Sequence, residues 1–263
     1  MNRIAYIRYT DIINNIGIQT GDIILISSDI VKLSWTCKEN NDIFDANLLL
    51  DSIISKIGDS GTLILPTYNW DFCKGIQFDY FKTKSKTGIL GQVALKRDDF
   101  MRTKHPIYSY AVWGRDKGLL CELDNQSAFG KDSPFAYMHH NKAKNILIDV
   151  DYKNCFTYVH YVEEQVGNIS YRYLKNFSAQ YKDKNNKITN RTYSMFVRDL
   201  DMDVQISINP LGKILEYEDV SKKYVINNSE IIKVDLYDAY SLIVDDIINN
   251  QSRNICSYIG QED

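Results

Sequence analysis

The sequence predicts a layered α/β/α fold with a central mixed sheet and an antiparallel C-terminal elaboration. Up to about residue 168, short apolar runs alternate with segments of helical periodicity, which is typical of strand-helix-strand units. Eleven of the 13 glycines lie at or before Gly167, so we expect the architecture to change there. Beyond it, long polar and aromatic stretches favour an antiparallel pair. We therefore expect a single domain over residues 1–263 with an internal boundary near residues 167–168.

The first half carries the strand and helix signals in alternation. A short helix begins at Thr10 or Asp11 and ends at Gly17, and Gly58 stops a later helix as a C′ residue. Since strands separated by helices pair in parallel, we expect parallel pairs in this half. The predicted strands are 23–27, 62–67, 110–114 and 145–150, and the predicted helices are 44–58, 115–123 and 134–141.

The second half has two clear local signals. KNNK at 184–187 is a plausible hairpin turn between two strands. The segment 234–250 has the apolar spacing of an amphipathic C-terminal helix.

Composition excludes several classes of protein. With 263 residues, 44% hydrophobic and 25% charged, the chain is typical of a globular protein rather than of a disordered one. Its net charge of −3 gives no electrostatic footprint for nucleic-acid binding. The start of the chain lacks the apolar region of a signal peptide, and no run approaches 18 apolar residues, so a cytoplasmic protein without a membrane partner is expected.

The cysteine pattern also favours a cytoplasmic protein. The five are widely spaced, and no C-x-x-C pair occurs, which argues against a disulfide framework or a structural zinc site. We expect reduced thiols and no metal.

The four histidines are the first candidates for a catalytic base, and His160 has the most informative setting. The segment 156–167 looks like a helix that ends at Gly167, with Phe156, Val159, Val162 and Val166 on one apolar arc. His160 lies at the edge of that arc, and Glu163 falls within about 40° of Val159 on the helical wheel. A carboxylate therefore points inward, and such a group needs a partner.

Two interpretations of this pair remain open on the sequence. In one, Glu163 orients His160 as a general base. In the other, the two form a surface i,i+3 or i,i+4 ion pair worth about 0.3–0.5 kcal/mol.

The other candidates carry weaker signals. His105 precedes Pro106 and is either a ligand contact or a residue that fixes a loop, whereas His139 and His140 near a helix end are expected to be solvated. Ser27 and Ser28 follow the first strand, where hydroxyl and backbone N–H groups can hold a phosphate.

Common nucleotide and hydrolase signatures are missing. The chain has no G-x-G-x-x-G, no Walker motif and no G-x-S-x-G, which argues against nicotinamide, P-loop and α/β-hydrolase sites.

Five stretches, taken in order, resemble the aminoglycoside 3-N-acetyltransferase family, and YEDV at 217–220 resembles its C-terminal part. The similarity covers most of the chain from about residue 10. The five are GDIILISS at 21–28, GTLILPTYNW at 61–70, TGILGQ at 87–92, RTKHPIYSYAVWG at 102–114 and TYVHYVEE at 157–164.

The resemblance implies an acetyl-CoA-dependent N-acyltransferase that acylates the amine of an amino sugar, with CoA as co-substrate. By motif position, His160 corresponds to the catalytic histidine and Glu163 to its carboxylate partner. Residues 1–167 then form the cofactor-binding and catalytic half, and 168–263 the substrate-side half. The implied cofactor-binding residues are Ser27, Ser28, Arg102, Ser109 and Thr157, and the implied substrate-binding residues are Thr67, Trp70, His105 and Tyr108.

The sequence departs from the pattern of the resistance enzymes at two positions. Ile26 and Tyr108 stand where those members usually have histidines, and PTYNWDFCKGIQFD at 66–79 looks more like relatives in deoxyamino-sugar biosynthesis. We therefore expect a nucleotide-linked deoxyamino sugar for a surface polysaccharide as acceptor, ahead of an aminoglycoside. Arg172, Lys175 and Arg191 in the Tyr-rich segment 171–194 also favour such an acceptor.

Two further questions stay open on the sequence. The chain could instead be a non-catalytic CoA-binding or interaction protein. A homodimer is also possible.

Overall fold

A seven-stranded mixed sheet forms the centre of the protein, in the order β10-β11-β6-β1-β2-β5-β4. The structure, a computed structural model, describes residues 5–258. β1 pairs in parallel with both β2 and β6, and the outer pairs are antiparallel. The strands of this sheet are β1 Ile23–Ser28, β2 Thr62–Pro66, β4 Met101–Arg102, β5 Tyr110–Gly114, β6 Lys144–Ile148, β10 Ser221–Ile226 and β11 Ser229–Asp235.

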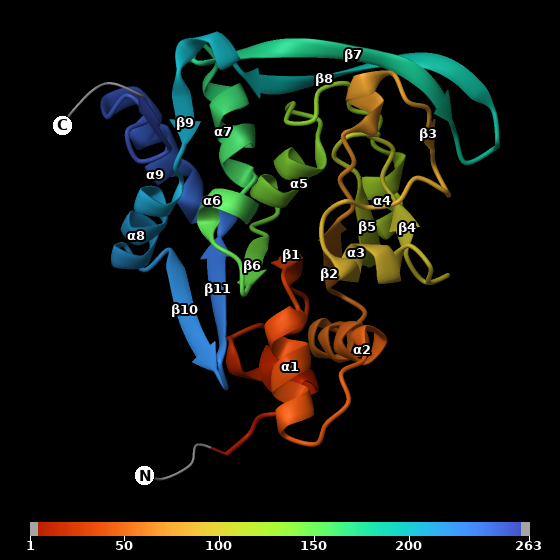
Figure 1. Cartoon of the computed structure of the whole chain (residues 1–263), viewed down its shortest axis with the longest axis vertical. Coiled ribbons are helices and arrows are strands. Elements are labelled where there is room, and N and C mark those ends of the chain that lie inside the picture. The colour runs from red at the N-terminus through yellow and green to blue at the C-terminus, as the bar shows by residue number, and fades with distance from the viewer. Residues whose placement is uncertain (1–4, 259–263) are drawn as a thin grey trace.

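Helices cover both faces of this sheet (Figure 1). The α-helices are α1 Val31–Glu39, α2 Ala46–Ile57, α3 Ile89–Ala94, α4 Lys117–Glu122, α5 Pro134–His140, α6 Tyr152–Cys155, α7 Tyr158–Val166, α8 Asn209–Tyr217 and α9 Leu236–Asn249. Short 3-10 helices are η1 Tyr9–Asn15, η2 Asp71–Lys74 and η3 Leu200–Met202.

The pleat of the central strands divides the interior into two cores. Ile24 and Ile26 of β1 face a core built with η1, α1, α2 and α3, whereas Leu25 faces a core built with α5, α7, α8 and α9. Both faces are therefore buried, as the near-continuous apolar run of β1 requires. The predicted α/β/α layering and mixed sheet are confirmed.

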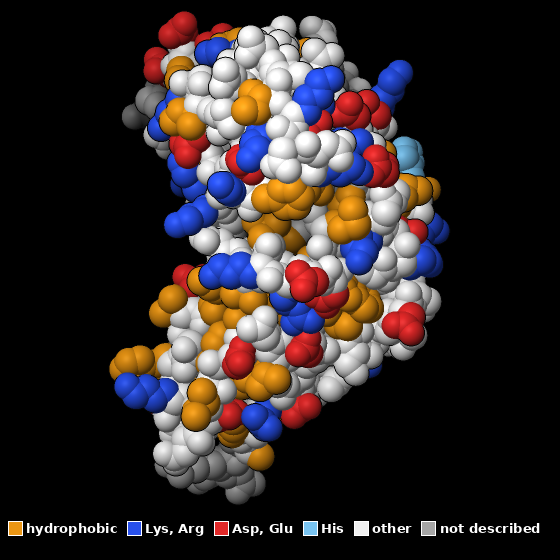
Figure 2. Space-filling model, turned by 90° about the vertical axis from the view of Figure 1, so that its right-hand side faces the viewer, with side chains coloured by type: hydrophobic (Ala, Val, Ile, Leu, Met, Phe, Trp, Pro, Cys, Tyr) orange, Lys and Arg blue, Asp and Glu red, His pale blue; other side chains and the backbone are white. Residues whose placement is uncertain are grey.

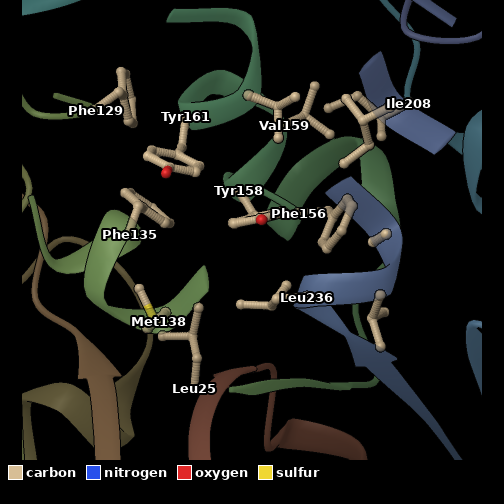
Figure 3. Packing of buried hydrophobic residues seen from close by; sticks show 14 of the residues in the cluster. Leu25, Phe129, Phe135, Met138, Phe156, Tyr158, Val159, Tyr161, Ile208 and Leu236 are labelled. Atoms are coloured by element: carbon tan, nitrogen blue, oxygen red, sulfur yellow. The ribbon is translucent and has the colours of Figure 1, made fainter. Parts of the chain in front are cut away.

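Aromatic packing fixes the position of α7. Tyr158, Val159 and Tyr161 of α7 are buried, and Figure 3 shows Tyr161 beside Phe135 of α5 and Tyr158 close to Phe156. Each large side chain buried in this way stabilises the fold by about 1.5–3 kcal/mol. With this face held inward, the remaining edge of α7 is turned to the cavity described below.

A long hairpin follows α7. β7 Arg172–Lys182 and β8 Ile188–Arg198 pair over their whole length in antiparallel fashion, so the predicted turn at 184–187 is confirmed. The two-residue strand β3 Phe78–Asp79 joins β7 to make a three-stranded sheet. In Figure 1 the hairpin extends across the top of the molecule, from α7 to the segment that carries β3. A separate pair consists of β9 Val204–Ile206 and β12 Cys256–Tyr258.

Both halves of the chain contribute to the main sheet, because β10 and β11 extend it beyond β6. The predicted C-terminal helix is confirmed as α9, and the first predicted helix is the 3-10 helix η1.

The prediction that His139 is solvated was wrong. Its ring packs against Tyr158, Tyr237 and Tyr240, and its Nδ1 lies 2.8 Å from the Tyr158 hydroxyl. The sequence signal misled because these tyrosines come from two other helices. His140, the next residue, is exposed as predicted.

The surface of the described residues carries both apolar and charged side chains. Hydrophobic side chains gather across the middle of the face shown in Figure 2, with acidic and basic side chains interspersed around them. Within residues 5–258 no helix has the length and apolar character needed to cross a membrane. All five cysteines are unpaired, as predicted.

Gly114, the last residue of β5, offers a test of the close packing at the end of this strand. Its φ of +101° is unfavourable for other residues, and a Cβ there would overlap the carbonyl oxygen of Gly61. We expect Gly114→Ala to lower the free energy of unfolding by about 1–3 kcal/mol, because strain and overpacking act together. Chemical denaturation measures this.

Gly118→Ala is the matched control. A Cβ on Gly118 meets no atom within 4 Å, and the residue lies in α4. Alanine there should be neutral or slightly stabilising. Equal destabilisation by both substitutions contradicts the explanation.

Candidate active site

A cavity of about 270 Å³ opens at the carboxyl ends of the central parallel strands. Ser27 and Ser28 at the end of β1 and Pro66 at the end of β2 form one wall, and Thr157 and His160 lie on another. β2 and β6 lie on opposite sides of β1, so the chain winds away from β1 in both directions. Such a switch point leaves a crevice for ligands in open α/β sheets.

Two glycines allow α3 to approach this crevice closely. Gly88, with φ of +66°, caps α3, and a Cβ there would lie 3.2 Å from the carbonyl oxygen of Ser28. A Cβ on Gly91 would overlap the carbonyl oxygen of Pro66. The segment 87–92 can therefore line the cavity only with glycine at these points.

His160 and Glu163 form a close pair on α7. The Nδ1 atom of His160 lies 2.7 Å from Oε2 of Glu163, as expected for residues three apart on a helix. The Glu163 side chain is fully buried, whereas that of His160 is 19% exposed. The interpretation as a surface ion pair is therefore wrong, and the inward carboxylate predicted from the helical wheel is confirmed.

Tyr171, just before β7, and Arg172, its first residue, complete the surroundings of Glu163. The Tyr171 hydroxyl donates to Oε1 of Glu163 at 2.8 Å, and Nε of Arg172 lies 2.7 Å from Oε2. Arg172 is also buried and donates to the carbonyl oxygen of Phe196 at 3.1 Å. The buried negative charge thus has a positive partner and a hydroxyl donor, which a buried carboxylate requires.

Sequence reasoning missed this use of Tyr171 and Arg172. The inward direction of Glu163 showed that partners must exist, but not which residues supply them. Gly167, with φ of +63°, ends α7 and reverses the chain, so that residues eight and nine positions after Glu163 come back to it.

These contacts shift both pKa values downward. Burial lowers the pKa of His160, the charge of Arg172 lowers it further, and Glu163 offsets only part of this. Burial alone would raise the pKa of Glu163, but Arg172, His160 and Tyr171 outweigh it and hold that pKa below its usual value. The geometry therefore favours a charged Glu163 beside a neutral imidazole.

The position of Nδ1 decides which ring nitrogen can meet a substrate. Nη2 of Arg172 also lies 3.0 Å from Nδ1 and can only donate, so Arg172 and Glu163 favour opposite tautomers. In the tautomer that donates from Nδ1 to Glu163, Nε2 is unprotonated. Nε2 receives no hydrogen bond from residues 5–258, and the imidazole lines the cavity. The arrangement can accept a proton from a bound ligand.

Five of the other predicted site residues line this cavity. Ser27, Ser28 and Thr157 surround one part of it, and Trp70 and Tyr108 another. The rings of Trp70 and Tyr108 meet edge to face at 6.3 Å, so they form one aromatic wall.

Four predicted site residues lie outside the cavity, in the layer that supports it. Arg102 is buried and donates to the carbonyl oxygens of Thr67 and Thr83 and to the Ser109 hydroxyl. The hydroxyls of Thr67 and Ser109 lie 2.9 Å apart. Arg102, Ser109 and Thr67 therefore bond to each other and to the backbone, and their contacts with ligands stay a prediction.

His105 belongs to the same supporting layer. It is 1% exposed, and its Nδ1 accepts from the backbone N–H of Tyr108 at 3.1 Å. Burial lowers the pKa of His105 to about 3, so it stays neutral. Of the two alternatives for His105, the structure favours the residue that fixes a loop, the one that carries Tyr108 into the cavity.

Cys155 is the one thiol on the cavity wall among the described residues. Burial raises its pKa to about 11, so the thiol stays protonated and is a poor nucleophile. Within residues 5–258 there is also no group of three His, Cys, Asp or Glu side chains arranged to hold a metal ion.

The sequence is similar to a known protein family and to a curated relative. The family model described as aminoglycoside 3-N-acetyltransferase matches residues 25–246. The SPbeta prophage-derived aminoglycoside N(3')-acetyltransferase-like protein YokD of Bacillus subtilis (strain 168) is 19% identical, over 94% of this chain and 93% of its own.

Solved structures show the same fold. The structure of AAC-IIIb in binary complex with CoASH superposes with a TM-score of 0.77 at 12% identity, over 94% of this chain and 98% of its own. Sisomicin-bound AAC-VIa gives a TM-score of 0.76 at 16% identity, over 94% and 99%.

The imidazole pKa of His160 can be measured directly. We expect an NMR titration to give a value below the ordinary 6.5, so that the ring stays neutral as the pH falls through 6.5. Arg172→Gln should raise this pKa, because it removes a positive charge next to the ring.

His160→Ala assigns the signal among the four histidines, and Arg191→Gln, on the same hairpin beside Asp124, is the control arginine. A wild-type value at or above 6.5, or an equal response to both arginine substitutions, contradicts the assignment.

Proposed function

Because this chain belongs to the aminoglycoside 3-N-acetyltransferase family and is an acetyl-CoA-dependent N-acetyltransferase, we propose that His160 is the base for acetylation of an amino-sugar amine. The observation that carries the proposal is the imidazole at the cavity, with Nδ1 held 2.7 Å from a fully buried Glu163. An alkyl amine is mostly protonated near neutral pH, and it attacks a thioester only after it loses a proton.

The proposed reaction is a direct transfer. The ammonium first loses one proton to solvent. As the nitrogen of the neutral amine bonds to the thioester carbonyl carbon, it loses a second proton to Nε2 of His160. The resulting tetrahedral intermediate collapses with cleavage of the carbon–sulfur bond, and the proton passes from His160 to the leaving sulfur. The protonated state of Cys155 favours this route over a covalent acyl-enzyme.

Glu163 acts as a positioning residue in this proposal. It holds the imidazole tautomer through Nδ1 and stabilises the imidazolium that forms during transfer. Tyr171 and Arg172 hold the carboxylate in turn, so the base is fixed before substrate arrives.

The cavity supports a binding mode for acetyl-CoA. Ser27, Ser28 and Thr157 offer hydroxyls in the same cavity as His160, as a slender chain with amide groups needs. We propose that the thioester end of acetyl-CoA lies there. Arg102 and Ser109 contribute by supporting the wall rather than by touching the cofactor.

The comparisons favour an aminoglycoside as the acceptor. One relative is described as bound to sisomicin, and the curated relative is described as aminoglycoside N(3')-acetyltransferase-like. None of the relatives named above is described as an enzyme of deoxyamino-sugar biosynthesis, so the expected closeness to such enzymes has no support. A nucleotide-linked amino sugar remains the second candidate. A second cavity, which also has His160 in its lining, is lined within residues 5–258 by basic side chains and by no Asp or Glu.

His160→Ala tests the proposed base. We expect acetyl transfer, followed as release of the CoA thiol, to fall by about 10²–10⁴-fold, because a general base contributes a factor of this size. The Kd for CoA should stay within about twofold, since the imidazole does not hold the cofactor in this proposal.

His140→Ala, an exposed histidine on α5, should behave as the wild type. The acceptor panel contains aminoglycosides and nucleotide-linked amino sugars. Unchanged turnover in His160→Ala refutes the role of the base, and CoA binding without turnover of any acceptor supports a non-catalytic CoA-binding protein.

A further inference from the structure

A second cavity, of about 340 Å³, meets the first at His160 and Tyr108. We name it the hairpin groove, because residues of β7 and β8 form most of its lining. The imidazole of His160 is therefore shared by two cavities. If the thioester lies in the first, as proposed above, the hairpin groove is the side from which an acceptor amine reaches the same nitrogen.

The hairpin groove is positively charged. Arg172, Lys175 and Arg198 line it, and neither Asp nor Glu does. The carboxylate of Glu163 compensates the charge of the Arg172 guanidinium. Neither Lys175 nor Arg198 has a carboxylate within 4.0 Å among the described residues.

The strand register strengthens this observation. Arg172 and Arg198 lie directly opposite each other in the β7–β8 pair. Glu163 compensates the charge of Arg172, so Arg198 is the cation without a carboxylate partner at this position among the described residues. Arg198 donates to the carbonyl oxygen of Val204 at 2.5 Å, so a main-chain contact holds its guanidinium in place without cancelling its charge.

Aromatic faces accompany these cations. Phe129 and Phe177 line the groove, and the Lys175 ammonium lies 5.8 Å from the centre of the Phe177 ring. Flat apolar surfaces beside unpaired cations suit a ligand that has both a ring and an anionic group. A polycationic acceptor would instead bring like charges together.

We infer that the hairpin groove binds a phosphate group carried by the acceptor, so the acceptor is a phosphorylated amino sugar, either a sugar phosphate or a nucleotide-linked sugar. On the charge of the groove, this class of acceptor ranks ahead of the aminoglycoside that the comparisons favour. This inference rests on the proposed function for the position of the amine at His160. Lys175 and Arg198 contact the phosphate, and the aromatic side chains contact the sugar or base. The groove thereby selects the acceptor, while the first cavity binds the donor.

Lys175→Glu tests the inference. We expect the KM for a phosphorylated amino sugar to rise by about tenfold or more, because a favourable charge contact becomes repulsive. The KM for acetyl-CoA should change by less than about twofold, and so should that for the same amino sugar without phosphate. Lys187→Glu, an exposed lysine in the turn of the same hairpin and outside the groove, is the matched control and should leave all three values unchanged.

The acceptor panel distinguishes the two sources of phosphate. An amino-sugar phosphate and a nucleotide-linked amino sugar are compared in each variant. A larger loss for the nucleotide-linked compound identifies it as the occupant of the groove, and equal losses identify the phosphate alone.

Equilibrium binding separates this inference from the proposed function. Calorimetry with each phosphorylated amino sugar, in the absence of acetyl-CoA, should show weaker binding to Lys175→Glu than to Lys187→Glu. If this difference appears without any acetyl transfer, the groove is confirmed and the proposed function fails. If Lys175→Glu raises the KM for acetyl-CoA instead, the groove binds CoA phosphates and the inference is overturned. Equal binding by both variants, or turnover of aminoglycosides alone, also overturns it.

Discussion

The burial of the Glu163 carboxylate is the constraint on which the site depends. A charge without solvent around it costs several kcal/mol unless ionic and hydrogen-bond partners compensate it. Here the partners are His160 one turn earlier on α7, Tyr171 just before β7 and Arg172 at its start. The carboxylate therefore adds ionic and hydrogen-bond contacts between a helix and a strand.

This junction has consequences beyond the pair itself. Because Arg172 is fixed at Glu163, the first residues of β7 and their partners on β8 lie beside His160. The hairpin then extends across the molecule to β3 (Figure 1). Burial lowers the pKa of His160 and Arg172 lowers it further, and the contact of Arg172 with Glu163 also brings the cationic hairpin groove to the imidazole. In our proposals, the base and the acceptor surface are positioned by one buried charge.

The main sheet contributes the other side of the site. The carboxyl ends of β1 and β2 provide Ser27, Ser28 and Pro66, and the close approach of α3 depends on Gly88 and Gly91. The structural relatives share this fold at only 12–16% identity. Such divergence leaves room for different surfaces around a common layout, and the charge of the hairpin groove is a property of residues on this chain. Fold similarity and acceptor choice are therefore separate questions for this protein.

The sequence by itself determined the layers, because each depends on a local pattern. Apolar runs located β1, β2, β5 and β6, and helical spacing located α2, α7 and α9. The helical wheel also predicted the inward direction of Glu163 correctly, since that direction depends only on its spacing from Val159.

Tertiary structure decided whatever depends on residues far apart in the chain. The packing of His139 against three tyrosines, the supporting role of Arg102 and the meeting of two cavities at His160 all join separate elements. Tyr171 and Arg172 were adjacent in sequence to a predicted boundary, yet no local pattern shows that the chain reverses at Gly167 to return them to Glu163. Periodicity reports the face on which a side chain lies, whereas its partner is set by packing between elements, and that information is not local.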